Sequence, residues 1–438
     1  MKKTRVKVVA VVENKDTPCW PCINHDYGKE LKRIMEPVRS LNPDMDFDVV
    51  PYTELSEAQA DYEDDLKKYD GVLVLLFTCW KKIELFYARQ AREGIPTIVA
   101  DVPFCGTGSA LCVAAPVIRD EKLPVPLLAT LDYTEIAQNV RIFKALKKIK
   151  EATILVIANN EPGPKAAVEA DWGMKIVIKS SADLHRCMTE VPGSEARAVA
   201  DRWISEACEI REASDADILE GAVLHLALKR MMKDVGADAV TVDCLELSYS
   251  DSYVGGKKFY PCLSHFEMLN NGGVAVCEAD LPALVTSLAV LYLTGRPGYV
   301  SDPVIDTSSG QIIYAHCVGC RKVFGPDDPR TCQYAIRSHA EDKNGASVQI
   351  IFPLGEQTTT LMINPSSLPS LIHSGEAVGN VGLQEACRSK LAVKTNARAI
   401  LNNSIGIWHH VTVYGEWREL FLNFLKAKGL GVIEEDKE

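Results

Sequence analysis

Apolar and polar positions alternate in two rhythms over the first 150 residues. Short continuous apolar runs, such as Gly71–Phe77, are typical of central parallel strands that are covered on both faces. Between them lie stretches with helical spacing of apolar residues. The predicted elements are strand Val6–Val12, helix Tyr27–Ser40, strand Phe47–Tyr52, strand Gly71–Phe77, helix Ile83–Glu93 (with Gly94 after its end) and strand Pro96–Ala100. This order predicts a doubly wound parallel sheet.

The same rhythm resumes near Glu151. Ser214-Asp215-Ala216-Asp217 is a helix-start signal, and Gly236 follows the last apolar position of that helix. Asp280 is a natural N-cap for a further helix, and Pro282 falls in the first turn of that helix. The predicted elements are strands Ala152–Ala158, Lys175–Lys179 and Ala237–Cys244, the helix after Ser214, and helix Leu281–Thr294.

After Gly295-Arg296-Pro297-Gly298 the long helical patterns stop. Short β-rich runs follow, at Gly310–Ala315, Ala346–Phe352, Thr358–Ile363, Leu391–Thr395 and Gly406–Val413, with a closing helix at Trp417–Ala427. The acidic end, Glu434–Glu438, is expected to fray. The chain is therefore predicted to be an α/β protein with two Rossmann-like doubly wound domains, residues 1–150 and 151–297, followed by a β-rich, barrel-like domain, residues 298–438.

Charge and composition exclude several classes of function. The 438 residues include 48 Lys and Arg against 59 Asp and Glu, a net charge of −11, which argues against nucleic acid or an anionic membrane as partner. No apolar run reaches the roughly 20 residues that span a bilayer. The N-terminal apolar run, Val8–Val12, is shorter than the about 7–15 residues of a signal-peptide core. We expect a cytoplasmic protein whose 14 cysteines are reduced thiols.

Two carboxylates flank the helix predicted at Leu281–Thr294. Glu278 follows the apolar run Val274–Cys277, at the strand end where open α/β sheets place their sites. Alternatively, it forms with Asp280 a pair that complements the helix dipole. Asp302 comes after the helix, and an antiparallel return of the chain would bring it back to Glu278. Alternatively, Asp302 starts a turn before Pro303.

Histidines supply the other candidate ligands. His409 and His410 are adjacent on a predicted strand, so their side chains point to opposite faces and only one can face a given site. The alternative is one surface and one structural histidine. His316, after the strand Ile312–Ala315, could bind a metal, hydrogen-bond a sugar hydroxyl or simply end the strand. His339 is similarly ambiguous.

Two Cys-x-x-Cys pairs, Cys19/Cys22 and Cys317/Cys320, suggest a four-cysteine zinc site or a redox pair. The two pairs of a zinc ribbon are separated by about 15–20 residues, and the separation between these two pairs is far larger. Cys-Trp-Pro-Cys after a first strand also resembles a thioredoxin-like arrangement, in which a helix N-terminus lowers the thiol pKa. A cysteine-dependent redox or zinc protein is kept as an alternative.

The order of several motifs resembles the L-fucose isomerase family and its L-arabinose isomerase relatives. The elements are CEADL at 277–281, LTGRP at 293–297, Asp302-Pro303, AHC at 315–317, GLQEACRSKLAVKT at 382–395 and WHHVTVYGEW at 408–417. The likeness extends from about Val240 to Leu430. The N-terminal half matches only in its general α/β organisation.

The resemblance implies an aldose–ketose isomerase that moves a proton between C1 and C2 of an open-chain sugar through a cis-enediol. It implies a divalent metal, usually Mn²⁺ with Mg²⁺ or Co²⁺ as alternatives, held by Glu278, Asp302 and a histidine. His409 is favoured over His410 for that ligand. Oxygen-rich ligands with an imidazole suit such ions better than zinc. Glu278 and Asp302 are also expected to be the catalytic proton-transfer pair.

The resemblance also implies contacts with a small-molecule sugar, for which His316, His410 and Asp243 are the substrate-binding candidates. Glu267 and His265 are near them in sequence. In L-arabinose isomerases a histidine similar to His316 joins the metal site. The family suggests a homo-oligomer, a trimer or hexamer. Because the chain is shorter than L-fucose isomerases, the sugar itself is not carried over. The alternatives are an enzyme of the same scaffold that acts on a modified sugar, and a non-catalytic sugar-binding protein.

Overall fold

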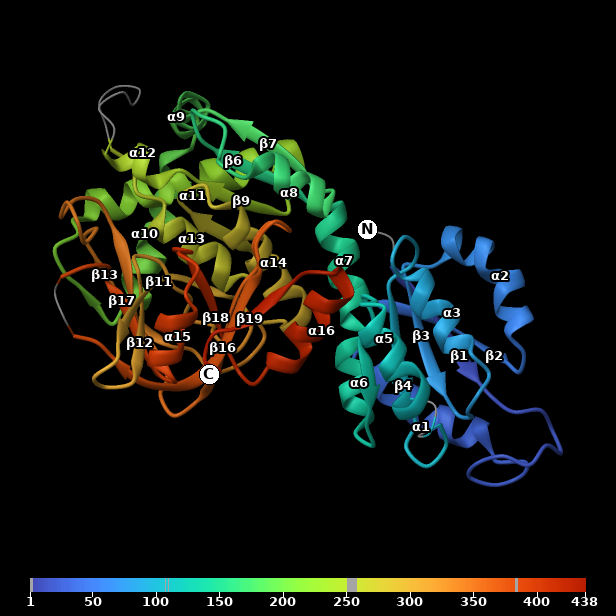
Figure 1. Cartoon of the computed structure of the whole chain (residues 1–438). Coiled ribbons are helices and arrows are strands. Elements are labelled where there is room, and N and C mark those ends of the chain that lie inside the picture. The colour runs from blue at the N-terminus through green and yellow to red at the C-terminus, as the bar shows by residue number, and fades with distance from the viewer. Residues whose placement is uncertain (1–2, 107, 109, 250–257, 383–384) are drawn as a thin grey trace. The chain divides into compact units, whose positions relative to one another are not determined.

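A computed structural model describes residues 3–106, 108, 110–249, 258–382 and 385–438 (Figure 1). Leu383 and Gln384 of the motif at 382–395 lie outside these residues. The chain forms two compact units, Met1–Lys148 with Glu419–Gly431, and Ile149–Arg418 with Val432–Glu438. None of the helices in the described ranges has the length and apolarity needed to cross a lipid bilayer.

The first unit is built on a parallel sheet with strand order β2-β1-β3-β4-β5. Its central strand β3 (Gly71–Leu76) is buried at every residue, as its continuous apolar sequence predicts. The other strands are β1 (Thr4–Val11), β2 (Met45–Tyr52), β4 (Thr97–Asp101) and β5 (Leu127–Ala129). The helices include α1 (Tyr27–Ser40), α2 (Leu55–Lys68), α3 (Ile83–Gln90), α5 (Ala115–Asp120), α6 (Tyr133–Asn139), α7 (Arg141–Glu151) and α16 (Arg418–Lys428).

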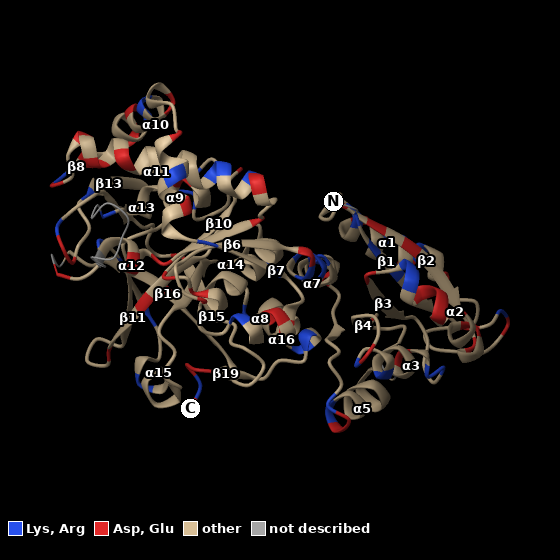
Figure 2. Ribbon diagram, turned by 90° about the horizontal axis from the view of Figure 1, so that it is seen from above, with Lys and Arg blue, Asp and Glu red and all other residues tan. Residues whose placement is uncertain are grey.

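The second unit contains a parallel sheet with strand order β10-β9-β6-β7. Its strands are β6 (Thr153–Ile157), β7 (Lys175–Lys179), β9 (Ala239–Val242) and β10 (Val274–Cys277). Helices α8 (Lys165–Trp172), α9 (Ser181–Thr189), α10 (Gly193–Glu206), α11 (Asp215–Val235), α12 (Cys244–Tyr249), α13 (Cys262–Asn270) and α14 (Leu281–Thr294) accompany it. Acidic and basic side chains are interspersed along α10, whereas α11 carries acidic side chains in its first two turns and mostly basic ones in its last turns (Figure 2).

The local signals predicted two of these helices correctly. Ser214 caps α11 by accepting a hydrogen bond from the Asp217 backbone N–H, and Gly236 ends the helix with a φ of 67°. Asp280 caps α14 in the same way, at the Ala283 backbone N–H. Both helices follow the rule that polar side chains satisfy the free N–H groups of the first turn.

A closed antiparallel barrel forms the rest of the second unit. Its strands hydrogen-bond in the order β15-β18-β11-β12-β17-β16, and pairing of β16 back to β15 closes the ring of six. They are β11 (Tyr299–Asp306), β12 (Gln311–His316), β15 (Gln357–Met362), β16 (Ser370–Asn380), β17 (Ser389–Lys394) and β18 (His410–Tyr414). A small sheet of β8 (Glu209–Ile210), β13 (Gln333–Arg337) and β14 (Ser347–Ile351) accompanies the barrel.

The predicted fold class is confirmed at this level: Rossmann-like parallel sheets and a closed antiparallel barrel. The three-domain boundaries stay a prediction. The prediction that Glu434–Glu438 would fray is wrong. Strand β19 (Val432–Glu434) pairs with β16, and Glu435 is 1% exposed. Its carboxylate accepts a hydrogen bond from His373 Nδ1 at 2.8 Å, so the acidic end is held by a buried partner.

Candidate metal centre

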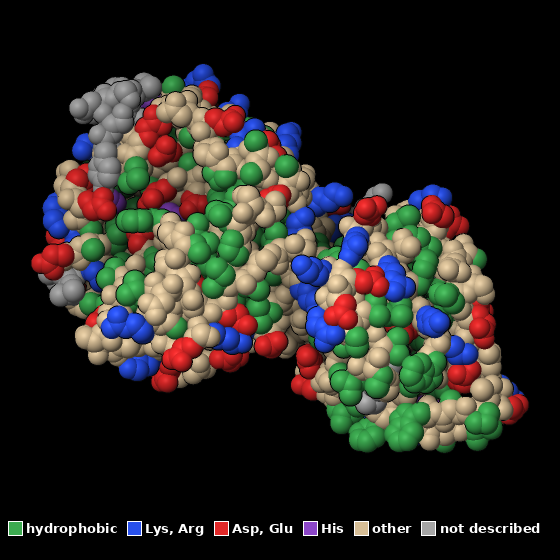
Figure 3. All heavy atoms as spheres, viewed as in Figure 1, with side chains coloured by type: hydrophobic (Ala, Val, Ile, Leu, Met, Phe, Trp, Pro, Cys, Tyr) green, Lys and Arg blue, Asp and Glu red, His purple; other side chains and the backbone are tan. Residues whose placement is uncertain are grey.

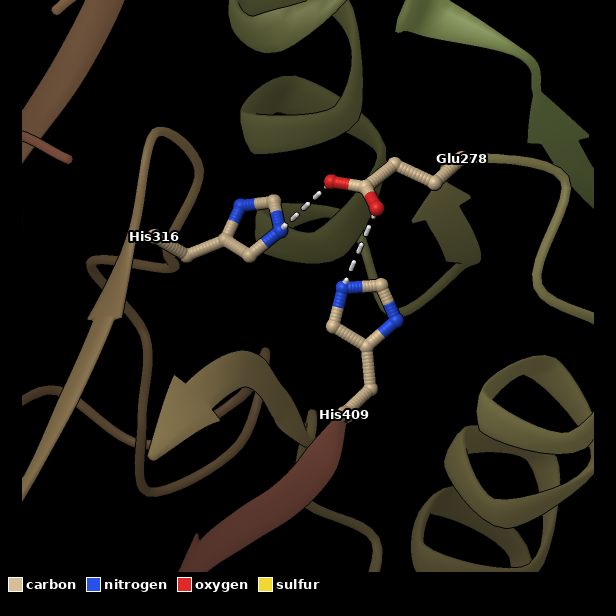
Figure 4. Close-up of side chains that lie close together, drawn as sticks. All are labelled: Glu278, His316 and His409. Atoms are coloured by element: carbon tan, nitrogen blue, oxygen red, sulfur yellow. Dashed lines mark ion pairs between the residues drawn. The ribbon is translucent and has the colours of Figure 1, made fainter. Parts of the chain in front are cut away.

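Glu278 lies at the carboxyl end of β10, in an unusual backbone conformation. Glu278 and Ala279 both adopt the left-handed region, with φ values of 64° and 52°. This conformation costs roughly 1–2 kcal/mol for a residue that has a Cβ atom. Such strain persists where the surrounding structure enforces it, and it is frequent at functional sites. The turn directs the Glu278 carboxylate toward His316 and His409 (Figure 4).

Three segments that are distant in sequence bring the other donors to Glu278. His316 ends β12, Asp302 lies within β11, and His409 directly precedes β18. Asp302 pairs in register with Ala315, next to His316, and Ser301 pairs with His410, next to His409. The alternative that Asp302 merely starts a turn is therefore wrong. The antiparallel return of the chain through β11 carries it back to Glu278.

The donor atoms lie at separations that one ion can bridge. Glu278 Oε1 is 3.9 Å from His316 Nε2, and Glu278 Oε2 is 3.7 Å from His409 Nε2 (Figure 4). Asp302 Oδ1 is 3.5 Å from His409 Nε2. Each separation is shorter than about 4.2 Å, twice a metal–ligand bond of about 2.1 Å. Ligand atoms of Glu278, His316 and His409 all lie within 4.8 Å of one another.

Several of these atoms are buried without a hydrogen-bond partner in the described part of the chain. They are Asp302 Oδ1, His409 Nε2 and both ring nitrogens of His316. A buried polar atom without a partner costs about 1–3 kcal/mol. Three of them, Asp302 Oδ1, His409 Nε2 and His316 Nε2, lie on the side of the Glu278 carboxylate and its neighbours, which indicates a bound group that accepts electron pairs from nitrogen and oxygen. A divalent cation fits this donor set.

Asp280 fixes the orientation of His409. Its Oδ1 accepts the Ala283 backbone N–H, and its Oδ2 accepts His409 Nδ1–H at 2.8 Å. With the proton on Nδ1, the lone pair of Nε2 points to Glu278 and Asp302. A carboxylate that holds the far nitrogen of a histidine ligand is a regular feature of protein metal sites. Sequence reasoning assigned Asp280 only as a helix cap, and no local signal showed its second role.

The charges of the cluster shift its pKa values in the direction expected of crowded carboxylates. Burial raises the pKa of Asp302 to about 6. Burial also raises the pKa of Glu278, and the negative charges of Asp302 and Asp280 add to this against the opposing effect of His409. Burial lowers the pKa of His316 to about 4, so its imidazole is neutral at pH 7 and can donate a lone pair. Burial opposes protonation of His409, but Asp280 and the neighbouring carboxylates raise its pKa overall.

The structure brings Glu278, Asp302, His316 and His409 together, and it places His410 toward Glu435 instead. Asp243 lies near Glu278 along the backbone, because Val242 pairs with Cys277 and accepts the Ala279 N–H at 3.2 Å. His410 Nε2 lies 3.5 Å from the buried Glu435 carboxylate, and its ring centroid is 6.0 Å from that of His373. Asp243 follows β9, where its Oδ1 accepts the Glu246 backbone N–H at 3.2 Å. His410 thus faces Glu435 rather than Glu278, and Asp243 caps the start of α12 beside the cluster. Substrate binding by either residue stays a prediction.

Other residues near the motif also have partners of their own. His265 is fully buried with its Nδ1 3.4 Å from Cys277 Sγ. Glu267 accepts hydrogen bonds from Arg202 and Trp203 and lines a separate cavity of about 630 Å³. Cys317 and Cys320 are buried in an apolar cluster of the second unit, whereas Cys19 and Cys22 belong to the first.

Comparisons with known proteins add little to this geometry. No protein-family model matches the chain, and no curated protein matches it. One similar solved structure is a periplasmic solute-binding protein of an ABC transporter from Actinobacillus succinogenes, with bound D-allose. It is 12% identical, covers 63% of this chain and 77% of its own, and has a TM-score of 0.20. A two-component system response regulator/GGDEF-domain protein is 11% identical over 65% of this chain and 97% of its own, with a TM-score of 0.28.

Proposed function

We propose that the chain is a metal-dependent aldose–ketose isomerase of the L-fucose/L-arabinose isomerase type. One observation carries this proposal: ligand atoms of Glu278, His316 and His409 lie within 4.8 Å of one another, Asp302 Oδ1 lies 3.5 Å from His409 Nε2, and Asp280 orients His409. These are the carboxylates and the histidine that the family resemblance implies, together with the additional histidine expected from the L-arabinose isomerases.

The substrate would be an open-chain sugar, isomerised through a cis-enediol. When bound, a divalent cation supplies Lewis-acid polarisation of adjacent sugar oxygens. Asp302 and Glu278 carry the proton between C1 and C2. A carboxylate beside the bound cation can accept a proton from one carbon and return it to the next. A positioned acid–base group contributes typically about 10²–10⁴-fold to the rate.

Mn²⁺ is the proposed cofactor. Two carboxylates and two imidazoles form a mixed oxygen and nitrogen donor set, which suits Mn²⁺ or Co²⁺ better than the all-oxygen shells preferred by Mg²⁺. The two other ions remain the alternatives to test. A hydrogen bond with Cys244, together with burial, raises the pKa of the Cys277 thiol beside Glu278, which disfavours thiolate ligation there.

We also propose a cytoplasmic homo-oligomer, a trimer or hexamer. All 14 cysteines are free thiols, as a reducing compartment requires. The first unit exposes hydrophobic side chains on the face seen in Figure 3. Its large apolar side chains with more than half of their surface exposed are Trp20, Ile23, Trp80, Phe104, Leu111 and Leu131. Exposed apolar groups of this kind mark interaction surfaces. Light scattering of the purified protein measures the assembly.

The test is an assay of common aldoses and ketoses with purified protein, after EDTA treatment and after addition of Mn²⁺, Co²⁺ or Mg²⁺. We expect interconversion of at least one pair that is lost with EDTA, restored by Mn²⁺ and absent in Glu278→Gln. Activity only on a sugar that carries a charged substituent would establish the modified-sugar alternative. Thermal stabilisation by a sugar without turnover would establish the non-catalytic binder. Full activity in EDTA would contradict the proposal.

A further inference from the structure

The loop between β1 and α1 carries three metal-ligand side chains at short spacing. Cys19, Cys22 and His25 form the pattern Cys-x-x-Cys-x-x-His. A fourth candidate ligand, Cys105, follows β4. The loops after β1 and β4 lie at the same edge of the parallel sheet, the one formed by the carboxyl ends of its strands. Parallel sheets place their ligand sites at this edge. In a protein with reduced thiols, closely spaced cysteines are more often metal-binding or catalytic than structural.

Two of the four side chains are already at ligand separation. His25 Nε2 lies 3.5 Å from Cys105 Sγ, although the two residues come from segments eighty residues apart. A tetrahedral zinc ion with bonds of about 2.1 Å to nitrogen and 2.3 Å to sulfur holds these atoms about 3.6 Å apart. Cys105 is 4% exposed, so His25 reaches a buried thiol beneath the loop.

The other two thiols lie on the same loop as His25. Burial raises the pKa of Cys105 to about 11, and the nearby Glu30, Asp101, Cys22 and Cys19 add to this. Cys19 Sγ is 3.4 Å from the Tyr27 hydroxyl and 3.4 Å from the Cys22 carbonyl oxygen. The four donor atoms have not closed on one point, so binding requires the Cys19 and Cys22 side chains to rotate.

A redox role for Cys19 and Cys22 fits the structure less well. A reactive Cys-x-x-Cys pair has its first thiol at a helix N-terminus, where the backbone N–H groups stabilise the thiolate. Here α1 starts only at Tyr27, and its N-cap Asp26 accepts the Lys29 backbone N–H. Both cysteines therefore precede the helix, on a loop. The same loop carries a third possible metal ligand, His25.

We propose that Cys19, Cys22, His25 and Cys105 bind one zinc ion, which ties the β1–α1 loop to the segment after β4. Three sulfur donors and one imidazole form a closed structural shell that zinc prefers. Binding ionises the three thiols and releases three protons to solvent, with no change in oxidation state. The site lies in the first unit and is separate from Glu278, so it does not depend on the proposed isomerase function.

The test measures metal by elemental analysis of the full-length protein, purified with reductant and supplied with Zn²⁺. Because Zn²⁺ also binds donor sets like the one at Glu278, we expect the unaltered protein to retain about one more zinc per chain after dialysis than Cys19→Ser or Cys105→Ser. Cys112→Ser, which removes an exposed thiol of the same unit, and Glu278→Gln should retain this zinc. Cobalt substituted at this site should give a sulfur-to-cobalt charge-transfer band that Glu278→Gln keeps and Cys105→Ser loses.

A second measurement uses the unaltered protein and does not depend on the folding of the variants. Iodoacetamide labelling followed by mass spectrometry should show Cys19, Cys22 and Cys105 protected when zinc is present and labelled after chelation. Cys112 should label equally in both states. The proposal is overturned if zinc is absent, if the cysteine variants keep as much of it, if the three thiols label alike with and without zinc, or if the purified reduced protein re-forms a Cys19–Cys22 disulfide in place of zinc binding.

Discussion

Asp280 caps helix α14 and also holds the imidazole of His409, a proposed metal ligand. One substitution can separate these two roles. Asn caps a helix about as well as Asp, so Asp280→Asn keeps the bond to the Ala283 N–H. Its amide would then donate to His409 Nδ1, which moves the imidazole proton to Nε2 and blocks the lone pair. We expect Mn²⁺ affinity to fall about 10–100-fold, measured by titration of free Mn²⁺ in electron paramagnetic resonance.

Asp306→Asn is the matched control for Asp280→Asn. Asp306 lies at the end of β11, where its carboxylate accepts hydrogen bonds from Ser308 and Ser309, away from the cluster. This variant should bind Mn²⁺ like the unaltered protein. Equal Mn²⁺ affinity in Asp280→Asn and Asp306→Asn would show that Asp280 serves only as a cap.

His316 and His410 should respond oppositely to removal. His316 faces Glu278, so His316→Ala should lower Mn²⁺ occupancy with little change in the free energy of unfolding. His410 faces Glu435 in the barrel, and His373 stays paired with that carboxylate, so His410→Ala should lower the free energy of unfolding by about 1–3 kcal/mol and leave Mn²⁺ affinity unchanged. Calorimetric Mn²⁺ titration and urea denaturation measure the two effects. Loss of Mn²⁺ binding in His410→Ala alone would reverse the assignment.

At the scale of elements, the turn between β10 and α14 stores backbone strain. Ala279→Gly removes the left-handed penalty at φ 52° and also loses a buried methyl group, and these effects oppose each other. We expect the free energy of unfolding to be unchanged or to rise by up to about 1 kcal/mol. Ala283→Gly, in the first turn of α14, should lower it by at least about 1 kcal/mol. Urea denaturation that shows equal losses in both variants would refute strain at Ala279.

Elements with local signals could be predicted from the sequence, and those defined by distant pairing could not. Asp280 and Pro282 define the start of α14, and the apolar run Gly71–Leu76 defines a buried strand. Strand β11 was missed, because its Asp302-Pro303 is a typical turn pair and only pairing with β12 and β18 makes it a strand. The opposite directions of His409 and His410 followed from strand geometry alone. The choice of His409 came from the family resemblance.

At the scale of the whole chain, the buried Glu435 makes stability depend on pH. Burial would raise its pKa, but His373 and His410 together lower it to about 2. Its ordinary value is about 4.3. A lowered pKa stabilises the fold above the ordinary value, and this stabilisation disappears as pH falls from about 4 to 2. Its size is on the order of 3 kcal/mol.

Glu435→Gln should therefore be less stable than the unaltered protein at pH 7, and the two should converge as the pH approaches 2. Glu438→Gln, at the exposed end of the chain, should follow the unaltered protein throughout. Denaturant unfolding of the three proteins at a series of pH values gives the comparison. A Glu435→Gln deficit that stays constant between pH 7 and pH 2 would mean that Glu435 acts through packing rather than charge.

The isomerase account is tested most directly by nuclear magnetic resonance of a sugar that the protein converts, incubated in D₂O with Mn²⁺. We predict that deuterium enters at C1 or C2 during conversion, because Asp302 or Glu278 carries the proton and exchanges it with solvent. The same sample should show neither conversion nor deuterium with EDTA or with Glu278→Gln. Conversion that continues in EDTA and in Glu278→Gln would contradict both the metal centre and the proton-transfer pair.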